Sequence, residues 1–196
     1  MFLTALIAAS LAAPVPKDKP AEPLMPVTVG TKRVLEITRG TFVSEMVEEV
    51  TKVAEKDGVY TIAVSSAAVM RTLGAKPPFP FLFEYAVSAT TVADTRFDPP
   101  RTIFDTTVKA GESWKYESKG KVVTTFTVSK EEEVEVPAGK FKAIPVIEET
   151  EKLGKITRWY APGVGMVKED KEGFGKSVTV LKSITPGKEA KKEEKK

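Results

Sequence analysis

Short segments in which apolar and polar residues alternate recur along the chain, and this feature constrains the fold most. Clear examples are residues 59–64, 79–87, 122–128 and 177–184. Alternation with a period of two is typical of a strand with one buried face, and these segments are rich in the Val and Thr that strands favour. Turn-forming residues such as Asp57-Gly58, Ala138-Gly139 and Pro162-Gly163 separate them. The pattern predicts a mostly β fold, an antiparallel curved sheet or an open half-barrel.

Two segments fit a helix as well as a strand. In residues 41–54, Met46, Val50 and Val53 also recur at helical spacing. We predict a strand there, because the matching segment of the repeat described below has a strand pattern. In residues 65–73, four apolar residues form one stripe that ends before Gly74, so we predict one short helix.

The first half of the chain is echoed in the second at a spacing of 81 residues, the distance from Gly30 to Gly111. Identical residues at this spacing include Val27 and Val108, Val47 and Val128, Val53 and Val134, and Gly58 and Gly139. In both halves an aromatic residue follows the second glycine by two positions. The repeat predicts two similar β-meander halves that pair into one sheet.

The two ends of the chain differ in composition from the middle. Residues 2–13 are almost all apolar or small, a run shorter than the roughly 20 residues that span a bilayer as a helix. We predict a secretory signal peptide over 1–12, although no Lys or Arg precedes the run, so a frayed N-terminal strand or a misplaced start codon is the alternative. Five prolines make residues 13–26 a predicted extended tether. Residues 27–186 form one β-rich domain, followed by a charged disordered tail over 187–196.

The composition excludes several kinds of chemistry. The 196 residues contain neither Cys nor His, which excludes disulfides, thiolate zinc sites and Ser-His-Asp triads. The net charge of +3 is too small for the basic face that nucleic-acid binding requires. The acidic runs 131–133 and 148–149 place consecutive carboxylates on alternate faces of a strand, so we interpret both as solvated. We expect no enzymatic activity, no catalytic residue, no metal, no cofactor and no nucleic-acid partner.

Three motifs follow one another in the second half of the chain. They are a G-x-x-W segment at 111–114, a V-P-A-G-x-F segment at 136–141 and the string W-Y-A-P-G-V-G at 159–165. Their order resembles a broad group of exported bacterial proteins of unknown function and, more distantly, the half-barrel of periplasmic lipoprotein-carrier proteins. The resemblance covers residues 108–183, implies an exported β fold and supplies no catalytic residues.

The same motifs have a direct structural interpretation. Pro137 presets one backbone angle of a tight turn in which Gly139 is free to take a positive φ. Phe141 then enters the next strand pointing inward. Pro162-Gly163 forms a second turn, after which Gly165 suits a bulge or a close backbone approach.

Aromatic residues supply the candidate binding surface. Phe79, Phe81, Phe83 and Tyr85 are spaced by two, so in a strand their rings share one face. We interpret the series either as a core ladder or as a surface for an apolar ligand, together with Trp114 and Trp159.

The sequence therefore predicts an exported binding domain without catalysis, located in the periplasm or outside the cell. The expected partner is a lipid or other apolar ligand, or an envelope protein, and the mature form is expected to have no transmembrane segment. The alternative is a structural or assembly module of the cell envelope.

Overall fold

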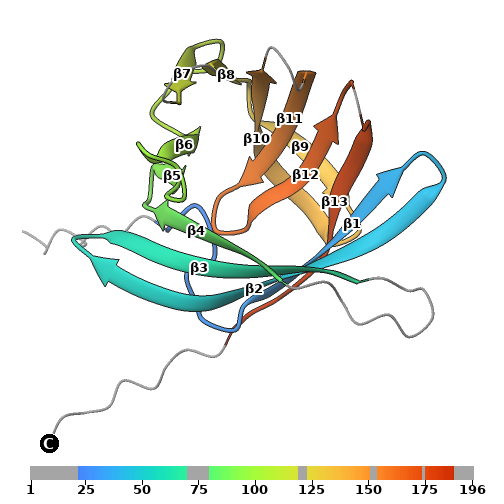
Figure 1. The fold of residues 1–196 in the computed structure, drawn as a ribbon, viewed down its shortest axis with the longest axis horizontal. Coiled ribbons are helices and arrows are strands. Elements are labelled where there is room, and N and C mark those ends of the chain that lie inside the picture. Colours follow the sequence, from blue (N-terminus) through green and yellow to red (C-terminus); the bar gives the residue numbers. More distant parts are fainter. Residues whose placement is uncertain (1–21, 70–79, 119–122, 151–153, 174, 188–196) are drawn as a thin grey trace, which may run out of the picture.

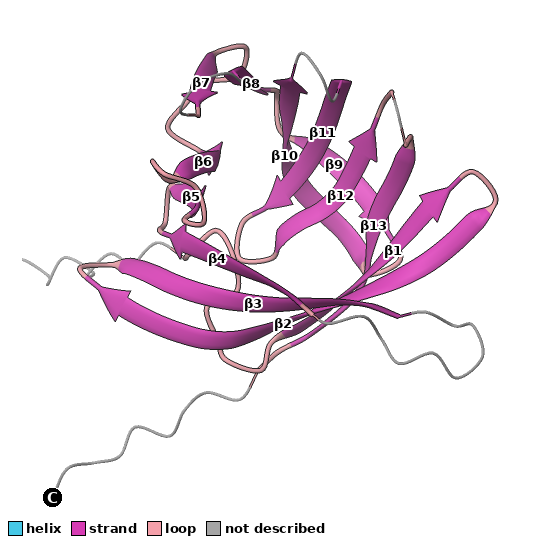
Figure 2. Ribbon diagram, viewed as in Figure 1, coloured by secondary structure: helices cyan, strands magenta, loops and turns pink. Residues whose placement is uncertain are grey.

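Thirteen β-strands make up the protein in the computed structural model, which describes residues 22–69, 80–118, 123–150, 154–173 and 175–187. The strands are β1 (Lys32–Arg39), β2 (Phe42–Lys56), β3 (Val59–Val69), β4 (Phe81–Val87), β5 (Thr91–Asp94), β6 (Arg101–Asp105), β7 (Ser113–Glu117), β8 (Val123–Val128), β9 (Glu132–Val136), β10 (Gly139–Thr150), β11 (Gly154–Ala161), β12 (Gly165–Lys171) and β13 (Ser177–Thr185). Within the described ranges there is no helix, and hence none that could cross a membrane (Figure 2). The predicted signal peptide over 1–12 and tail residues 188–196 lie outside these ranges.

The strands form one curved antiparallel sheet in the order β6-β5-β4-β3-β2-β1-β13-β12-β11-β10-β8-β7, which confirms the predicted fold class. The two halves of the chain join where β1 pairs with β13. The sheet curls until its two end strands, β6 and β7, lie near each other without pairing (Figure 1). The result is a nearly closed barrel with a seam between β6 and β7.

The predicted internal repeat is present in the strands. β1 to β3 occupy residues 32–69, and β7 to β10 occupy residues 113–150, which is the same span displaced by 81 positions. Each half begins with a comparable backbone contact: Gly30 N donates to Val50 O at 2.8 Å, and Gly111 N donates to Val128 O at 2.8 Å, an acceptor three positions before the one that the spacing of 81 gives. The strand ranges therefore follow the repeat as far as β3 and β10, but the strand registers do not: Lys32 pairs with Glu49, whereas its counterpart Ser113 pairs with Thr127 and not with residue 130.

The two halves differ at the long strand β2, whose counterpart in the second half is divided into β8 and β9. β2 remains continuous through a register shift between Val50 and Lys52. At the matching place in the second half the chain leaves the main sheet, and β9 pairs only with the beginning of β10. The β9–β10 hairpin packs against β12 and β13, and Ala138 N donates to Leu181 O at 3.1 Å. This hairpin covers a second core, distinct from the one that surrounds the cavity described below.

The buried apolar residues form two clusters. The larger lies between β2–β6 on one side and β7, β8, β10 and β11 on the other, and includes Ile62, Phe104 and Phe126. The smaller lies beneath the β9–β10 hairpin. Leu24 and Met25, which fall in the segment expected to be a tether, are 3% and 9% exposed and belong to the larger cluster. The packed domain therefore begins before residue 27.

The prediction of a short helix over residues 65–73 is wrong for residues 65–69, which lie in β3; residues 70–73 are outside the described ranges. Ser66 pairs with Glu48 of β2 on one side and with Phe81 of β4 on the other. Pairing on both sides satisfies the backbone groups and outweighs a weak helical stripe. The strand predicted over 41–54 is confirmed, because β2 spans Phe42–Lys56.

Candidate functional site

A cavity of about 170 Å³ lies inside the sheet, beside the larger core. Its apolar lining comes from Met25, Pro26, Val50, Val64, Phe83, Ile103 and Met166. Its polar lining comes from Thr31, Arg33, Glu48, Tyr85, Asp94, Arg96, Arg101, Arg158 and Tyr160. An empty cavity of about 150 Å³ can hold a benzene molecule, so this space suits one small group rather than a whole lipid.

The aromatic wall of the cavity comes from β4. The rings of Phe83 and Tyr85 stack with centroids 6.2 Å apart and planes 2° apart. The guanidinium of Arg96 lies over the Phe83 ring, 4.2 Å from its centroid. Because alternate residues of a strand share one face, the period of two in this segment places both rings on the inner side.

Arg33 of β1 and Glu48 of β2 form an ion pair at one side of the cavity. The two residues are register partners, and Arg33 Nη1 lies 3.0 Å from a carboxylate oxygen of Glu48. Arg33 also donates to the carbonyl oxygen of Met166. Arg33 is only 6% exposed, so this charge is held in the interior by its partners.

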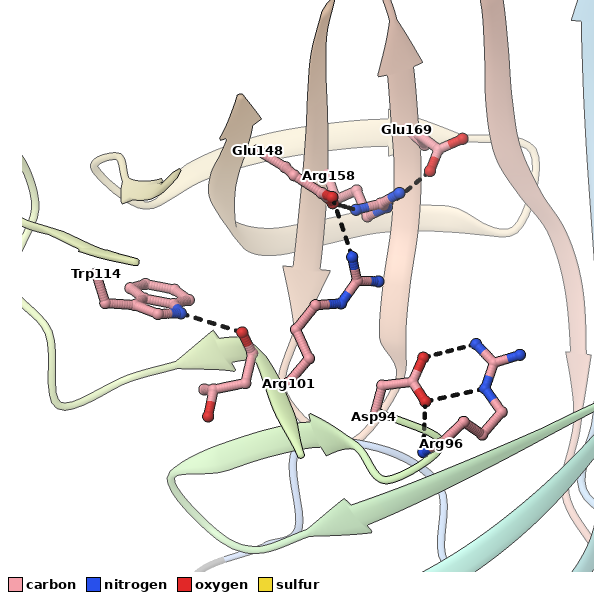
Figure 3. A network of polar contacts seen from close by, with 8 residues as sticks. Asp94, Arg96, Arg101, Trp114, Glu148, Arg158 and Glu169 are labelled. Carbon is pink, nitrogen blue, oxygen red and sulfur yellow. Dashed lines mark hydrogen bonds and ion pairs between the residues drawn. The ribbon is translucent and has the colours of Figure 1, made fainter. Parts of the chain in front are cut away.

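Asp94 and Arg96 form a second pair. Asp94 is 2% exposed and accepts from Arg96 Nε at 2.9 Å and from Arg96 Nη2 at 2.6 Å (Figure 3). The Asp94 carboxylate also accepts from the Arg96 backbone N–H at 3.1 Å. This two-pronged contact fixes the guanidinium in the position from which it covers Phe83.

A chain of four charged residues connects β6, β10, β11 and β12. Arg101 Nη1 donates to Glu148 at 3.3 Å, Arg158 Nη1 donates to the other oxygen of Glu148, and Arg158 Nε donates to Glu169 at 2.7 Å (Figure 3). Burial on its own lowers the pKa of Arg158, but Tyr160, Glu148 and Glu169 more than offset this and raise the pKa above its usual value. Arg158 therefore remains a cation beside the cavity.

Two tyrosine side chains complete the polar lining. Burial raises the pKa of Tyr160 to about 12, and the nearby Glu148 and Glu169 add to this effect. Burial also raises the pKa of Tyr85, with Glu48 and Asp94 adding to it. Both phenols therefore keep their protons at neutral pH and can donate hydrogen bonds.

The structure separates the four aromatic residues that the sequence grouped together. Phe83 and Tyr85 line the cavity. Phe81 lies on the same strand but is 67% exposed and does not line it. Phe79 lies outside the described residues.

The two tryptophans of the predicted surface also lie away from this cavity. Trp114 of β7 stacks on Phe126, with centroids 5.1 Å apart, and its Nε1 donates to Thr102 O at 3.0 Å. Trp159 of β11 packs against the smaller core and lies beneath the ammonium group of Lys168, 4.4 Å from the ring centroid. Both residues hold parts of the sheet together.

The interpretation of residues 148–149 as a solvated acidic run is wrong for Glu148. Glu148 is 7% exposed and bonded to two arginines, whereas its neighbour Glu149 is exposed. The sequence correctly predicted that Glu148 and Glu149 point to opposite faces of the strand. The face that is buried, however, carries the Glu148 carboxylate. The arginines of the cavity were not predicted as site residues, because isolated arginines in strand segments resemble surface positions. Within the described residues, no group of three or more acidic residues is placed to hold a metal ion.

The fold and cavity define a class of protein: a domain that is exclusively β over the described residues and that contains a small, partly open cavity lined by polar, aromatic and aliphatic side chains. A family model described as DUF3108-like matches residues 90–181. A protein described as exported, with a YmcC-like fold, from Bacteroides fragilis NCTC 9343 is similar in structure at a TM-score of 0.62 and 15% identity, over 84% of this chain and 99% of that one. A protein described as a lipoprotein, from Parabacteroides distasonis ATCC 8503, has a TM-score of 0.57 and 16% identity, over 85% of this chain and 100% of that one. At these identities the likeness establishes a shared fold. No curated protein matches the sequence.

Proposed function

We propose that the protein is an exported, non-catalytic binding module of the bacterial cell envelope, which holds a small ligand group in its interior cavity. The periplasm or the outside of the cell is the proposed location. Two observations support export: the apolar N-terminal segment of the sequence, and the descriptions of two proteins of the same fold as exported and as a lipoprotein.

The observation that carries the binding proposal is the cavity beside Phe83, Tyr85 and Tyr160. Most side chains of a β-barrel interior fill the space between strands, but here about 170 Å³ is left open among aromatic and charged groups. An apolar wall with a few fixed polar groups is the usual composition of a small-molecule site. The volume limits the enclosed part of the ligand to a benzene-sized group or a short chain.

Two variants of the same strand test this proposal. Phe83→Ala removes a ring that lines the cavity, whereas Phe81→Ala removes a ring of equal size that is 67% exposed and outside it. Native mass spectrometry of the protein purified from its own envelope should show a small bound molecule in the wild type and in the Phe81→Ala variant. The molecule should be lost from the Phe83→Ala variant, with circular dichroism showing that both variants are folded. A wild-type protein without bound molecule that also binds nothing from an envelope extract would overturn the proposal.

A structural or assembly module is the second candidate, and exposed apolar side chains favour it. Phe42 and Val43 at the start of β2 are 78% and 62% exposed, and Phe81 and Leu82 at the start of β4 are 67% and 63% exposed. The two strand starts lie at the same end of the β2–β4 sheet, because both strands run antiparallel to β3. An envelope protein captured by the wild type but not by a Phe42→Ser/Phe81→Ser variant would support this role.

A further inference from the structure

The charges that line the cavity are unequal. Four guanidinium groups, of Arg33, Arg96, Arg101 and Arg158, face it, but only two carboxylates of the described residues do. The two remaining carboxylates of the network, Glu148 and Glu169, bind Arg101 and Arg158 but are not part of the lining. The cluster of four guanidinium groups and four carboxylates is neutral overall, but guanidinium groups outnumber carboxylates among the residues that line the cavity.

Arg101 makes the fewest hydrogen bonds of these cations, although its guanidinium also lies over the Phe97 ring, 4.4 Å from the centroid. Among the described residues it makes one hydrogen bond, of 3.3 Å, to a carboxylate that it shares with Arg158, and its buried Nε has no partner. The buried Nε of Arg33 also has no partner in the described part of the chain. A buried donor without an acceptor is unfavourable, and both such groups in this wall are donors. The wall therefore has unused capacity for a molecule that brings acceptor oxygens.

The phenols and the apolar wall define the rest of the ligand. Tyr85 and Tyr160 line the same space, and their protonated hydroxyl groups are further donors. An apolar surface also lines the cavity and comes from Val50, Val64 and Ile103. A ligand that consisted of a charged group alone would make no use of this surface. A ligand that satisfies both parts has an anionic oxygen group at one end and a short apolar chain at the other.

We infer that the cavity binds an anionic amphiphile, with its carboxylate or phosphate group on Arg101 and its apolar chain against Phe83 and Ile103. This inference rests on the proposed binding function and adds the chemical class of the ligand. Carboxylates and phosphates are the groups that the planar guanidinium recognises best, since they accept two parallel hydrogen bonds.

Isothermal titration calorimetry of the full-length protein at pH 7 tests the inference with octanoate, octyl phosphate and octan-1-ol. The two anions should bind at least about tenfold more tightly than the alcohol, which has the same chain and no charge. Equal affinity for octan-1-ol would overturn the anionic class and leave the proposed binding function standing. Failure of all three to bind would overturn the inference and count against the proposed function itself. Acetate or inorganic phosphate binding as tightly as the amphiphiles would assign the site to a free anion and overturn the amphiphile class.

A charge-matched pair of variants locates the head group. Arg101→Gln removes the proposed contact but leaves Glu148 bonded to Arg158. Lys140→Gln makes the same change of charge on the β9–β10 hairpin, outside the cavity, where the Lys140 side chain is 60% exposed. Octanoate affinity should fall about tenfold or more in the first variant and remain within about twofold in the second. An unchanged affinity in folded Arg101→Gln protein would overturn the assignment.

Discussion

The indole Nε1 of Trp114 donates a hydrogen bond of 3.0 Å to the carbonyl oxygen of Thr102, and this bond crosses the seam between β7 and β6 (Figure 3). The two strands are the unpaired ends of the sheet. The Trp114 side chain therefore connects β7 to β6, whereas neighbouring strands elsewhere in the sheet are connected by backbone hydrogen bonds. Trp114 also stacks on Phe126 with planes 10° apart, so its ring is fixed on the β8 side as well.

Replacing Trp114 by Phe should weaken the seam while keeping most of the stacking on Phe126. The lost hydrogen bond leaves the Thr102 carbonyl without this partner, so the free energy of unfolding should fall by about 1 kcal/mol. Urea unfolding measures this loss, and hydrogen exchange should rise in β6 and β7 before it rises in β3. Unchanged stability together with unchanged exchange would mean that the seam does not depend on this bond.

Replacement by alanine should lower the free energy of unfolding far more at Glu148 than at the adjacent Glu149. Glu148→Ala leaves two arginines without their shared buried carboxylate, so unfolding should become easier by about 3–5 kcal/mol. Glu149→Ala removes an exposed carboxylate and should change stability by less than about 0.5 kcal/mol. Urea denaturation of both variants checks the prediction, which equal effects would contradict.

Much of the sheet could be predicted because its signals are local. Alternation identified β4 and β13, and the repeat resolved residues 41–54 as a strand, since the matching positions in β8 and β9 had a clearer pattern. The same logic failed over residues 65–69. There, pairing of β3 with two neighbouring strands decides the structure, and pairing is not visible in a short window of sequence.

The site could be predicted only in part, for the same reason. The period of two placed Phe83 and Tyr85 on one face, but it could not show that the cavity ends before Phe81, because other strands set that limit. Likewise, Glu148 is buried because Arg101, 47 residues away, comes next to it. A local sequence pattern cannot show that two residues this far apart in the chain form an ion pair.

Stability at high pH should depend on Tyr160. Its folded-state pKa is raised from 10.0 to about 12, so the folded protein favours the protonated phenol more than the unfolded chain does. The resulting stabilisation is complete below pH 10 and is lost as the pH rises toward 12. Tyr160→Phe removes this dependence while the ring can still stack on Phe104. The wild type should therefore lose on the order of 1 kcal/mol per pH unit more than the variant across this range. Chemical denaturation at several pH values measures both slopes, and parallel slopes would contradict the prediction.

Gly165, at the beginning of β12, should tolerate a methyl group poorly. Its φ is +81°, and a Cβ atom there would lie 3.3 Å from Met25 Cγ and 3.5 Å from Arg33 Nη1. Gly165 itself pairs with Ala161, and the register shift with β11 falls at Val167, so of the two alternatives predicted for Gly165, a bulge or a close approach, the close approach is the one confirmed.

The glycine of the β2–β3 turn supplies the matched control. Gly58 has a φ of +77°, and a Cβ atom there would have no neighbour from the described residues within 4 Å, so Gly58→Ala reports backbone strain without crowding. That strain costs about 1–2 kcal/mol. Gly165→Ala should cost more, because Met25 and Arg33 must also move, and Arg33 is held by its bonds to Glu48 and Met166. Urea unfolding of the two variants gives the difference. Equal losses would show that the space beside Gly165 adjusts freely and that Arg33 is not held rigidly at the edge of the cavity.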